Sequence, residues 1–365
     1  MKVQKISRNF MLVLVTGMLL SCSLSNIQLT KYRHPIKIHT SLQDDFLEDN
    51  YQAVGRYASG QEELSRPNPV ELSWKFKKQE NANFIVKISE NKDLSNPIIM
   101  ETSSLSVSVY NLKIGTKYYW NVSADDYDNS YTSATDTFEI EGYGPRNLYV
   151  DGVTNVRDVG GWKIDDTYRV KQGLFYRSGR FNTSESSTVI KEITSAGEKV
   201  LLEDLKIKSE MDLRRIDNNE VGSITSSVLG DSVTYFSCPM EWNGNILELN
   251  TEMVRHIFSD ILSKEENYPL IFHCNIGTDR TGMIAYLLNG LLGVSEDDLY
   301  YDYLFSNFGR IGGLRTAGSI SNNYVATIKY TDGDTLPQKI SNYLLSIGVT
   351  SEEINAIKTM FIEKI

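Results

Sequence analysis

The sequence predicts two folded parts, a small all-β sandwich followed by an α/β domain whose central, mostly parallel sheet is flanked by helices. Over residues 67–142, short runs alternate apolar and polar residues and are separated by turn residues, which is typical of antiparallel strands. From residue 147 onward, strand and helix patterns alternate along the chain, as in an α/β layer. The 365 residues, 41% of them hydrophobic, are enough for two cores.

Residues 1–22 have the pattern of a secretion signal. Basic residues precede an apolar run from Phe10 to Leu20, which is short for a membrane span but suits the core of a signal peptide. The box that ends at Cys22 resembles the cleavage site of bacterial lipoproteins, and this resemblance implies cleavage before Cys22 and acylation of that cysteine. We therefore expect a lipid-anchored, extracytoplasmic protein of the bacterial cell envelope. An uncleaved membrane anchor and plain secretion are the alternatives.

Charge and cysteine content limit the partners. The net charge of −10 argues against nucleic acid as a partner, so we expect contact with the membrane only through the lipid at Cys22. Three cysteines, at positions 22, 238 and 274, cannot form a disulfide framework. Cys238 is expected in a hydrophobic core, and a role as the redox partner of Cys274 is the alternative.

The segment from residue 23 to residue 66 separates the signal from the predicted sandwich. It is polar and weakly periodic, with an acidic cluster between Asp44 and Asp49. Because such a segment offers little apolar surface to bury, we predict that it is a tether.

The predicted sandwich, residues 67–142, contains five strands. Leu72-Ser-Trp74 in the first strand, and the stretch that leads through Tyr118 to Trp120 in the fourth, resemble a fibronectin type III domain. The three aromatic residues are expected in the core, and a carbohydrate-binding stripe on the surface is the alternative. The strands are predicted at Val70–Phe76, Asn83–Ile88, Leu105–Val109, Tyr118–Ala124 and Asp136–Ile140.

A segment rich in glycine and proline, residues 142–145, is predicted to link the sandwich to the α/β domain at 147–365. In such a domain the functional site lies at the carboxyl ends of the parallel strands. The predicted elements are helical material in 184–205, a strand at 209–213, a helix at 252–262, a strand at 268–273, a helix at 281–293 and C-terminal helices between 344 and 361.

The loop from His273 to Gly282 sets a cysteine and an arginine six positions apart, between a buried strand and a helix. Such a loop directs successive backbone N–H groups and the helix dipole at one point. A thiol at this point ionises readily, and a phosphate monoester would be held by the same amides. The planar fork of Arg280 matches two phosphate oxygens. Cys274 is therefore the candidate nucleophile and Arg280 the candidate phosphate clamp.

The ten-residue loop resembles the signature of cysteine-dependent phosphatases, and its Asp-Arg-Thr-Gly ending resembles the bacterial tyrosine/serine protein phosphatase family. Other blocks resemble the same family, in the same order, over residues 147–365. The resemblance implies a phosphatase fold and hydrolysis through a cysteinyl-phosphate intermediate. We expect no metal or other cofactor. The blocks are Asn155-Val-Arg157-Asp158-Val-Gly160-Gly161, Tyr176-Arg177-Ser178-Gly179, Met211-Asp212-Leu213-Arg214 with Glu220 downstream, and Asp302-Tyr303-Leu304-Phe305-Ser306-Asn307.

The other loop residues have expected roles in binding and catalysis. Thr281 follows the clamp and could hydrogen-bond the sulfur to help it leave during hydrolysis, or cap the helix, or do both. His273 is expected to hold loop backbone through its ring rather than to carry protons. The substrate phosphate is expected to bind at Asn275, Ile276, Gly277, Thr278 and Gly282.

Two residues are candidates for the proton donor to the leaving oxygen. Asp279 lies in the loop itself, where the family often carries an aspartate implicated in acid catalysis. Glu241 lies 33 residues before the nucleophile, about where related phosphatases place a mobile acid loop. We favour Asp279, because a general acid needs hydrogen-bond reach. Asp212 is a third candidate, but an ion pair with Arg214 or Arg177 is its expected role.

The expected function is that of a lipid-anchored phosphomonoesterase, a protein-tyrosine phosphatase of single or dual specificity. Thr278 stands where many members of the family, above all those that act on phosphoinositides, have lysine. The missing cation disfavours multiply phosphorylated substrates, so a phosphotyrosine-containing protein is the expected substrate. One alternative is an inositol-phosphate or phosphoinositide phosphatase. Another is a non-catalytic binding module of the envelope, in which the sandwich contacts a glycan or a protein.

Overall fold

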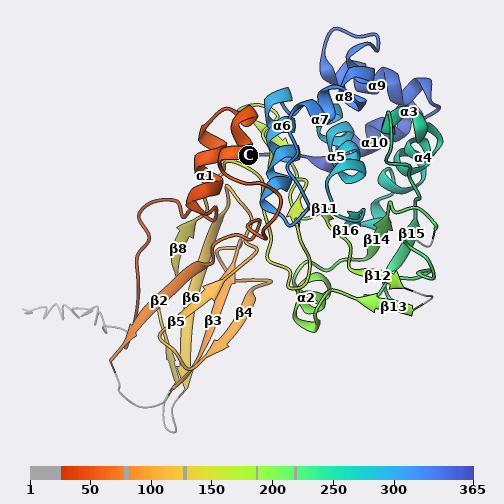
Figure 1. Cartoon of the computed structure of the whole chain (residues 1–365). Coiled ribbons are helices and arrows are strands. Elements are labelled where there is room, and N and C mark those ends of the chain that lie inside the picture. Colours follow the sequence, from red (N-terminus) through yellow and green to blue (C-terminus); the bar gives the residue numbers. More distant parts are fainter. Residues whose placement is uncertain (1–25, 78–81, 126–129, 186–187, 218–219) are drawn as a thin grey trace, which may run out of the picture.

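The computed structural model describes residues 26–77, 82–125, 130–185, 188–217 and 220–365. These residues form an all-β part and an α/β part that lie side by side (Figure 1). No helix within the described ranges is long and apolar enough to cross a membrane. The predicted signal segment, including Cys22, lies outside the described residues.

The all-β part consists of two antiparallel sheets that share one core. One sheet has the order β1-β2-β5 and the other the order β4-β3-β6-β7, with β8 pairing along β6 as well. Alternate residues of the strands point into the core between the sheets, as the sequence pattern predicted. The strands are β1 (Ile27–Leu29), β2 (Val70–Phe76), β3 (Asn83–Ser89), β4 (Ile98–Thr102), β5 (Ser106–Val109), β6 (Lys117–Asp125), β7 (Ser130–Thr132) and β8 (Asp136–Glu139).

The aromatic residues of the sandwich lie inside it. Trp120 is fully buried, and Trp74 packs edge-on against Phe84 with the ring centroids 5.2 Å apart. Tyr118 is also buried and stacks on Phe138. The core prediction is therefore confirmed, and the alternative of a carbohydrate-binding stripe is wrong because none of the three rings is exposed.

Residues 30–66 form an insertion between β1 and β2 that packs onto the α/β part. The prediction of a tether over residues 23–66 is therefore wrong for 26–66, while residues 23–25 lie outside the described ranges. Helix α1 (Ser41–Glu48) and the 3-10 helix η1 (Tyr51–Arg56) form within this insertion, and Figure 1 shows α1 beside α6.

Tertiary contacts explain why the insertion is ordered. A capping box between Thr40 and Gln43 starts α1. Phe46 is fully buried, and its ring centroid lies 5.4 Å from that of Tyr301 and 5.7 Å from that of Phe308. A helix of two turns gains most of its stability from such packing, so the sequence of the segment alone gave little signal.

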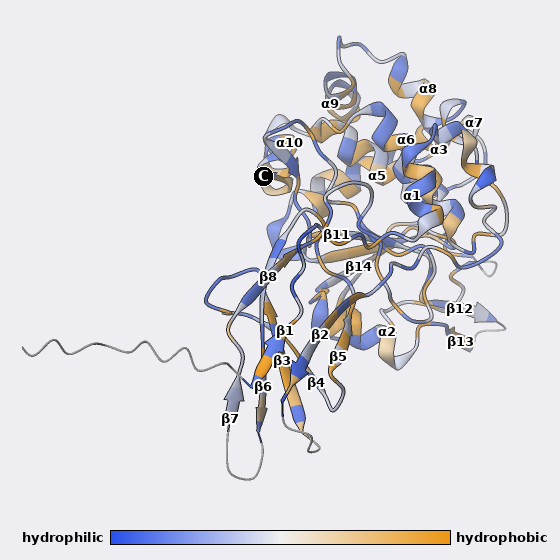
Figure 2. Ribbon diagram, turned by 90° about the vertical axis from the view of Figure 1, so that its left-hand side faces the viewer, coloured by the Kyte–Doolittle hydropathy of each residue, from blue (hydrophilic) through white to orange (hydrophobic). Residues whose placement is uncertain are grey.

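The α/β part is built on a five-stranded sheet of order β15-β14-β16-β11-β9. The first four strands are parallel and β9 is antiparallel to β11, which confirms the predicted mostly parallel sheet. In Figure 2 the labelled strands β11 and β14 lie below the helices α5 and α6. The middle strand of the sheet, β16, has the sequence LIFH and is buried at all four residues. The strands are β9 (Arg157–Asp158), β11 (Phe175–Ser178), β14 (Ser209–Asp212), β15 (Thr234–Ser237) and β16 (Leu270–His273), and two short strands pair outside the sheet, β10 (Tyr168–Val170) and β17 (Ile362–Lys364).

Helices surround this sheet, as predicted. The central one, α5 (Asp279–Leu292), is buried over nearly its whole length and ends at Gly293, whose φ of 103° is a typical left-handed helix end. The other helices are α2 (Ser195–Lys199), α3 (Ile246–Leu249), α4 (Thr251–His256), α6 (Glu296–Leu304), α7 (Gly318–Ser321), α8 (Tyr324–Lys329), α9 (Leu336–Ser346) and α10 (Ser351–Phe361), with short π or 3-10 turns η2 (Val200–Asp204), η3 (Ile257–Leu262), η4 (Glu265–Asn267) and η5 (Phe305–Phe308).

The helical prediction for residues 184–205 is wrong in its first half. A hairpin of β12 (Asn182–Glu185) and β13 (Thr188–Lys191) occupies it, and the helical part begins only at Ser195. The β-branched residues of β13 favour an extended backbone, and pairing with β12 satisfies the hydrogen-bonding groups of that backbone.

Hydrogen bonds of two side chains, those of Arg146 and Gln172, join the two parts of the chain. Arg146 donates from Nε to Leu112 O (3.1 Å) and from Nη1 to Asp158 (2.7 Å). The side chain of Gln172 bonds both the N–H and the carbonyl of Ile114, at 3.0 and 2.8 Å. The sandwich is therefore fixed against the α/β part just after the predicted linker.

Candidate active site

The loop between β16 and α5 depends on one glycine. Gly277 has a φ of 68°, in the left-handed region that favours glycine. A Cβ at this position would lie 2.3 Å from the carbonyl oxygen of Ser178, which belongs to β11. No other residue fits there without moving the neighbouring strand.

Side chains and backbone outside the loop hold its carbonyl groups. Asn155 Nδ2 donates to the carbonyls of Ile276 (3.1 Å) and Gly277 (3.0 Å), and Arg177 Nη2 donates to Gly277 O (2.9 Å). The backbone N–H groups of residues 275–278 have no hydrogen-bond partner among the described residues. With the carbonyls bound on the outside, these donors are free for an anion on the inside of the loop.

A buried ion-pair triad supports this arrangement. Asp302 of α6 accepts from Arg157 Nε (2.9 Å) and from Arg177 Nη1. Both guanidinium groups and the carboxylate are almost fully buried. Because a buried charge is costly without its partner, the triad fixes Arg177 and through it the loop.

The nucleophile candidate, Cys274, is 2% exposed and follows β16 directly. Burial by itself would raise the pKa of its thiol. The charge of Arg280 and the neighbouring hydroxyl and N–H of Thr281 outweigh burial, so that the pKa of Cys274 is lowered overall. The Thr281 hydroxyl is buried and has no hydrogen-bond partner of good geometry among the described residues, so its predicted bond to the sulfur stays a prediction. The alternative of a side-chain cap fails, because α5 has no such cap.

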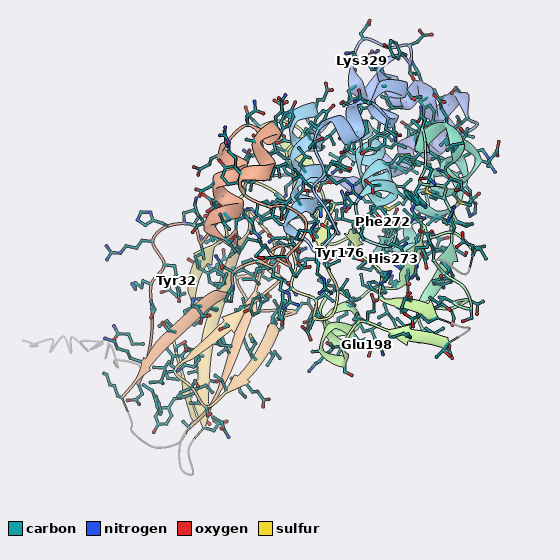
Figure 3. All side chains as sticks on the ribbon, viewed as in Figure 1. Tyr32, Tyr176, Glu198, Phe272, His273 and Lys329 are labelled. Carbon is teal, nitrogen blue, oxygen red and sulfur yellow. The ribbon has the colours of Figure 1, made fainter. Side chains whose placement is uncertain are left out.

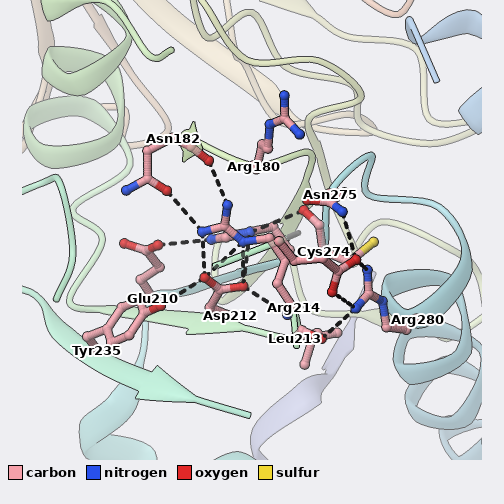
Figure 4. Close-up of polar contacts among 12 residues, drawn as sticks. Arg180, Asn182, Glu210, Asp212, Leu213, Arg214, Tyr235, Cys274, Asn275 and Arg280 are labelled. Atoms are coloured by element: carbon pink, nitrogen blue, oxygen red, sulfur yellow. Dashed lines mark hydrogen bonds and ion pairs between the residues drawn. The ribbon is translucent and has the colours of Figure 1, made fainter. Parts of the chain in front are cut away.

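Arg280 is held from behind and leaves one edge open. Its Nη1 donates to the carbonyl of Leu213 at 3.2 Å (Figure 4) and to that of Met240 at 3.1 Å. Glu220 accepts from both Nη1 and Nη2 at 2.7 Å. The Nε hydrogen and one Nη2 hydrogen have no partner among the described residues. These two parallel donors form the fork that binds two oxygens of a phosphate.

His273 holds the loop from inside the sheet. Its ring is fully buried, with Nδ1 3.3 Å from the carbonyl oxygen of Cys274 and Nε2 2.9 Å from Glu210. Figure 3 shows the residue at the centre of the α/β part. The expected role in positioning the backbone agrees with these contacts.

A cluster of His273, Glu210 and Asp212 has the donor types of a metal site, with its ligand atoms within 4.8 Å of one another. Asp212, however, already accepts from the guanidinium of Arg214 and from the Tyr235 hydroxyl at 2.8 Å (Figure 4). The cluster is therefore better described as a satisfied ion-pair network. The pairing of Asp212 with Arg214 also agrees with its expected role and places it away from proton donation.

Sequence comparison agrees with the geometry of the loop. A profile described as the tyrosine phosphatase family matches residues 148–363, more than half of the chain. The chain belongs to the tyrosine phosphatase family.

Individual relatives of this phosphatase-family chain are distant. The "putative tyrosine-protein phosphatase" of Cupriavidus necator is 28% identical over 186 residues, a match that covers 45% of this chain but only 64% of the relative's length. The catalytic core of the PP-IP phosphatase SIW14 from S. cerevisiae, solved with citrate, is 16% identical, with coverage of 52% of this chain and 91% of that chain and a TM-score of 0.30. TpbA of P. aeruginosa, solved with pTyr, is 16% identical, with coverage of 49% and 88% and a TM-score of 0.31.

The two candidate proton donors lie on different elements. Asp279 is the first residue of α5, and its carboxylate accepts from the Tyr303 hydroxyl (2.9 Å) and from two nitrogens of Arg315 (3.1 and 3.2 Å). Glu241 lies on the exposed rim and pairs with Arg215 at 3.3 Å. Asp279 is fixed at the start of α5 by Tyr303 and Arg315, and the choice between the two acids stays a prediction.

If Asp279 donates the proton, Asp279→Asn should slow hydrolysis of an alkyl phosphate about 10²- to 10⁴-fold, the usual contribution of general acid catalysis. An activated aryl phosphate, whose leaving group needs little protonation, should lose far less. Steady-state kcat for both substrates checks this. Glu241→Gln is the matched variant and should lack the leaving-group dependence. Equal losses on both substrates for Asp279→Asn would assign this residue to loop shape alone.

Two further loop residues have structural reasons for their identity. The Thr278 side chain is buried and accepts from Asn155 at 3.4 Å, so it places no cation beside the substrate. A Cβ on Gly282 would come within 2.8 Å of the Tyr303 ring, so this glycine allows α5 and α6 to approach. Gly282 therefore shapes the helix behind the loop.

Cys238 lies in the hydrophobic core next to β15 and is fully buried. Burial raises the pKa of its thiol to about 12. The protonated thiol is a poor partner for redox exchange, so the structure favours the expected core role.

Two residues that shape the site have no role that sequence patterns predict. Glu220 was noticed only as part of a family block, yet it orients the phosphate clamp. Arg315 lies in a loop 36 positions after Asp279 and was missed entirely. A single arginine in a glycine-containing loop gives no sequence signal for a role in the site, because its pairing with Asp279 depends on the tertiary fold.

Proposed function

We propose that this chain is a protein-tyrosine phosphatase that works through a cysteinyl-phosphate intermediate. In the first step the Cys274 thiolate attacks phosphorus, the bond from phosphorus to the ester oxygen breaks, and the acid protonates that oxygen. In the second step a water oxygen attacks phosphorus and gives its proton to the carboxylate that the acid became in the first step, and the S–P bond breaks to release phosphate and the thiolate. The loop amides and Arg280 stabilise the charge on the equatorial oxygens in both steps.

The burial of the phosphate-binding site is the main argument for phosphotyrosine as the substrate. Cys274 is 2% exposed and Arg280 is 4% exposed, so both lie below the surface. A phosphorylated phenol projects its phosphate further from the peptide backbone than phosphoserine does. The lack of a cation at Thr278 also disfavours polyphosphorylated inositols. A phosphotyrosine-containing protein therefore fits best.

Phosphotyrosine, phosphoserine and phosphoinositide substrates should be compared side by side with the purified protein. We expect kcat/KM for a phosphotyrosine peptide to exceed that for the matched phosphoserine peptide by tenfold or more. Enzymes that lose a buried contact with the poorer substrate discriminate by about 10² or more, so tenfold is a low threshold. Faster turnover of the phosphoinositide would contradict the proposal.

The proposal includes a lipid anchor at Cys22 and a place in the bacterial cell envelope. It rests on the basic start, the apolar run and the cysteine box of residues 1–22. The sheet orders β1-β2-β5 and β4-β3-β6-β7, with β8 also paired along β6, support the further proposal that the sandwich is of the fibronectin type III kind.

Cys22→Ala should move the full-length protein from the membrane fraction to the soluble fraction, because acylation needs the thiol. Cell fractionation with immunoblotting measures the shift. Cys238→Ala is the matched control, because Cys238 is buried in the core of the α/β part, and this variant should stay with the membranes. Unchanged membrane association of Cys22→Ala would favour an uncleaved helix.

A further inference from the structure

A groove of about 580 Å³ opens directly beside the phosphate clamp. We call it the rim groove. Met240 lines it and also accepts from Arg280 Nη1 through its carbonyl (3.1 Å). Arg215 lines it too, and the Arg215 N–H donates to Glu220, the carboxylate that holds Arg280 (2.6 Å). The rim groove is thus one residue away from the clamp, where the chain on either side of a bound phosphotyrosine would lie.

The charged residues of the rim groove are mostly acidic. Four carboxylates, those of Asp217, Glu241, Glu248 and Glu252, line it against a single guanidinium. That guanidinium, on Arg215, contacts Asp217 at 3.1 Å and Glu241 at 3.3 Å. The charge of Arg215 is therefore shared between two carboxylates at one end of the groove. At the other end Glu252 contacts Arg255 at 3.6 Å. Glu248 instead accepts a hydrogen bond from the neutral hydroxyl of Thr327 at 3.3 Å. The four carboxylates thus outnumber the two guanidinium groups, and the groove keeps a net negative charge.

The walls between these carboxylates are apolar and exposed. Ile216 is 66% exposed and Leu249 is 57% exposed, and Met253 lies nearby in the same lining. Figure 1 places α3 and α4, which carry Glu248 and Glu252, above the β14–β15 edge of the sheet. A lysine or arginine side chain combines an apolar stem with a cationic head, and so matches both the walls and the carboxylates.

We propose that the rim groove binds a basic residue that flanks the phosphotyrosine, so that the preferred substrates are phosphotyrosine segments with lysine or arginine nearby. This inference rests on the proposed function and names its substrate class. An acidic flank, or a second phosphate on the same substrate, would meet like charges in the groove and bind less well.

Matched phosphotyrosine peptides, differing only in lysine or glutamate around the phosphotyrosine, test the proposal. Wild-type kcat/KM should be about threefold to tenfold higher for the lysine peptide, the size of effect expected for exposed ion pairs. The double variant Glu248→Gln/Glu252→Gln should lose most of this preference, while turnover of p-nitrophenyl phosphate, which does not reach the groove, should not change. Raised salt should weaken the preference as well.

A control variant and a binding measurement separate the two proposals. Glu265→Gln/Glu266→Gln removes two exposed carboxylates at the opposite end of β16 and should keep the preference. Binding of the same peptides to the Cys274→Ser protein, followed by fluorescence anisotropy, reports the groove without turnover. Equal affinity for lysine and glutamate peptides would overturn the groove assignment. Absent turnover of every phosphotyrosine substrate by wild type would instead overturn the proposed function.

Discussion

Replacing Cys274 with serine should lower the rate of p-nitrophenyl phosphate hydrolysis by roughly 10⁴-fold or more, because the loss of a covalent nucleophile leaves only the contribution of binding. The loop lowers the pKa of the thiol, but a hydroxyl in the same place does not ionise near neutral pH. The substitution removes little volume, so folding should be intact. Steady-state kinetics and a thermal melt on the same preparation measure both properties.

The other described cysteine provides the control for this experiment. Cys238→Ala leaves the phosphate-binding loop unchanged and should keep activity within tenfold of wild type, with some loss of stability from the cavity. Activity of Cys274→Ser within tenfold of wild type would rule out Cys274 as the nucleophile. A trapped phosphoryl adduct on Cys274 of the wild type, found by mass spectrometry after rapid acid quench, would support it directly.

Arg280→Lys should reduce kcat/KM by about 10²- to 10³-fold, the typical cost of losing a donor that stabilises transition-state charge. A lysine keeps the positive charge but cannot bind two phosphate oxygens through a planar fork while bonding Glu220 and two backbone carbonyls. The loss of the fork should appear mainly in kcat, because charge on the equatorial oxygens develops in the transition state.

An exposed arginine supplies the comparison. Arg56 lies on η1 with most of its side chain in solvent, and Arg56→Lys should leave both kcat and KM unchanged. Wild-type activity of Arg280→Lys would show that the loop does not clamp phosphate. A melting temperature near that of wild type would confirm that any loss comes from the site.

The parts of the fold that follow from local pattern could be predicted from the sequence. The alternation in Val70–Phe76 and the apolar run before Cys274 correspond to β2 and β16. The segment around Phe46 could not be recognised, because its apolar residues are few and their partners, such as Tyr301, come from far along the chain. Residues 182–191 show the same limit, since a short polar hairpin and a helix start look alike in sequence.

The candidate site divides in the same way. Cys274 and Arg280 share one loop, so their spacing alone was enough to pair them. The orientation of Arg280 depends on Glu220, sixty positions away, and that of Asp279 depends on Arg315. Such contacts are set by how the strands and helices pack, and a single sequence carries no separate record of them.

The position of β1 limits the distance between the active site and a lipid attached at Cys22. Strand β1 begins at Ile27, five residues after Cys22 in the sequence, and pairs with β2 from its first residue. Five residues extend at most about 18 Å. If Cys22 is acylated as proposed, the chain between the lipid and β1 is short, and the sandwich and the α/β part are held together. The active site would then stay close to the membrane. We expect it to act on phosphotyrosines near the bilayer rather than on those of proteins far from it.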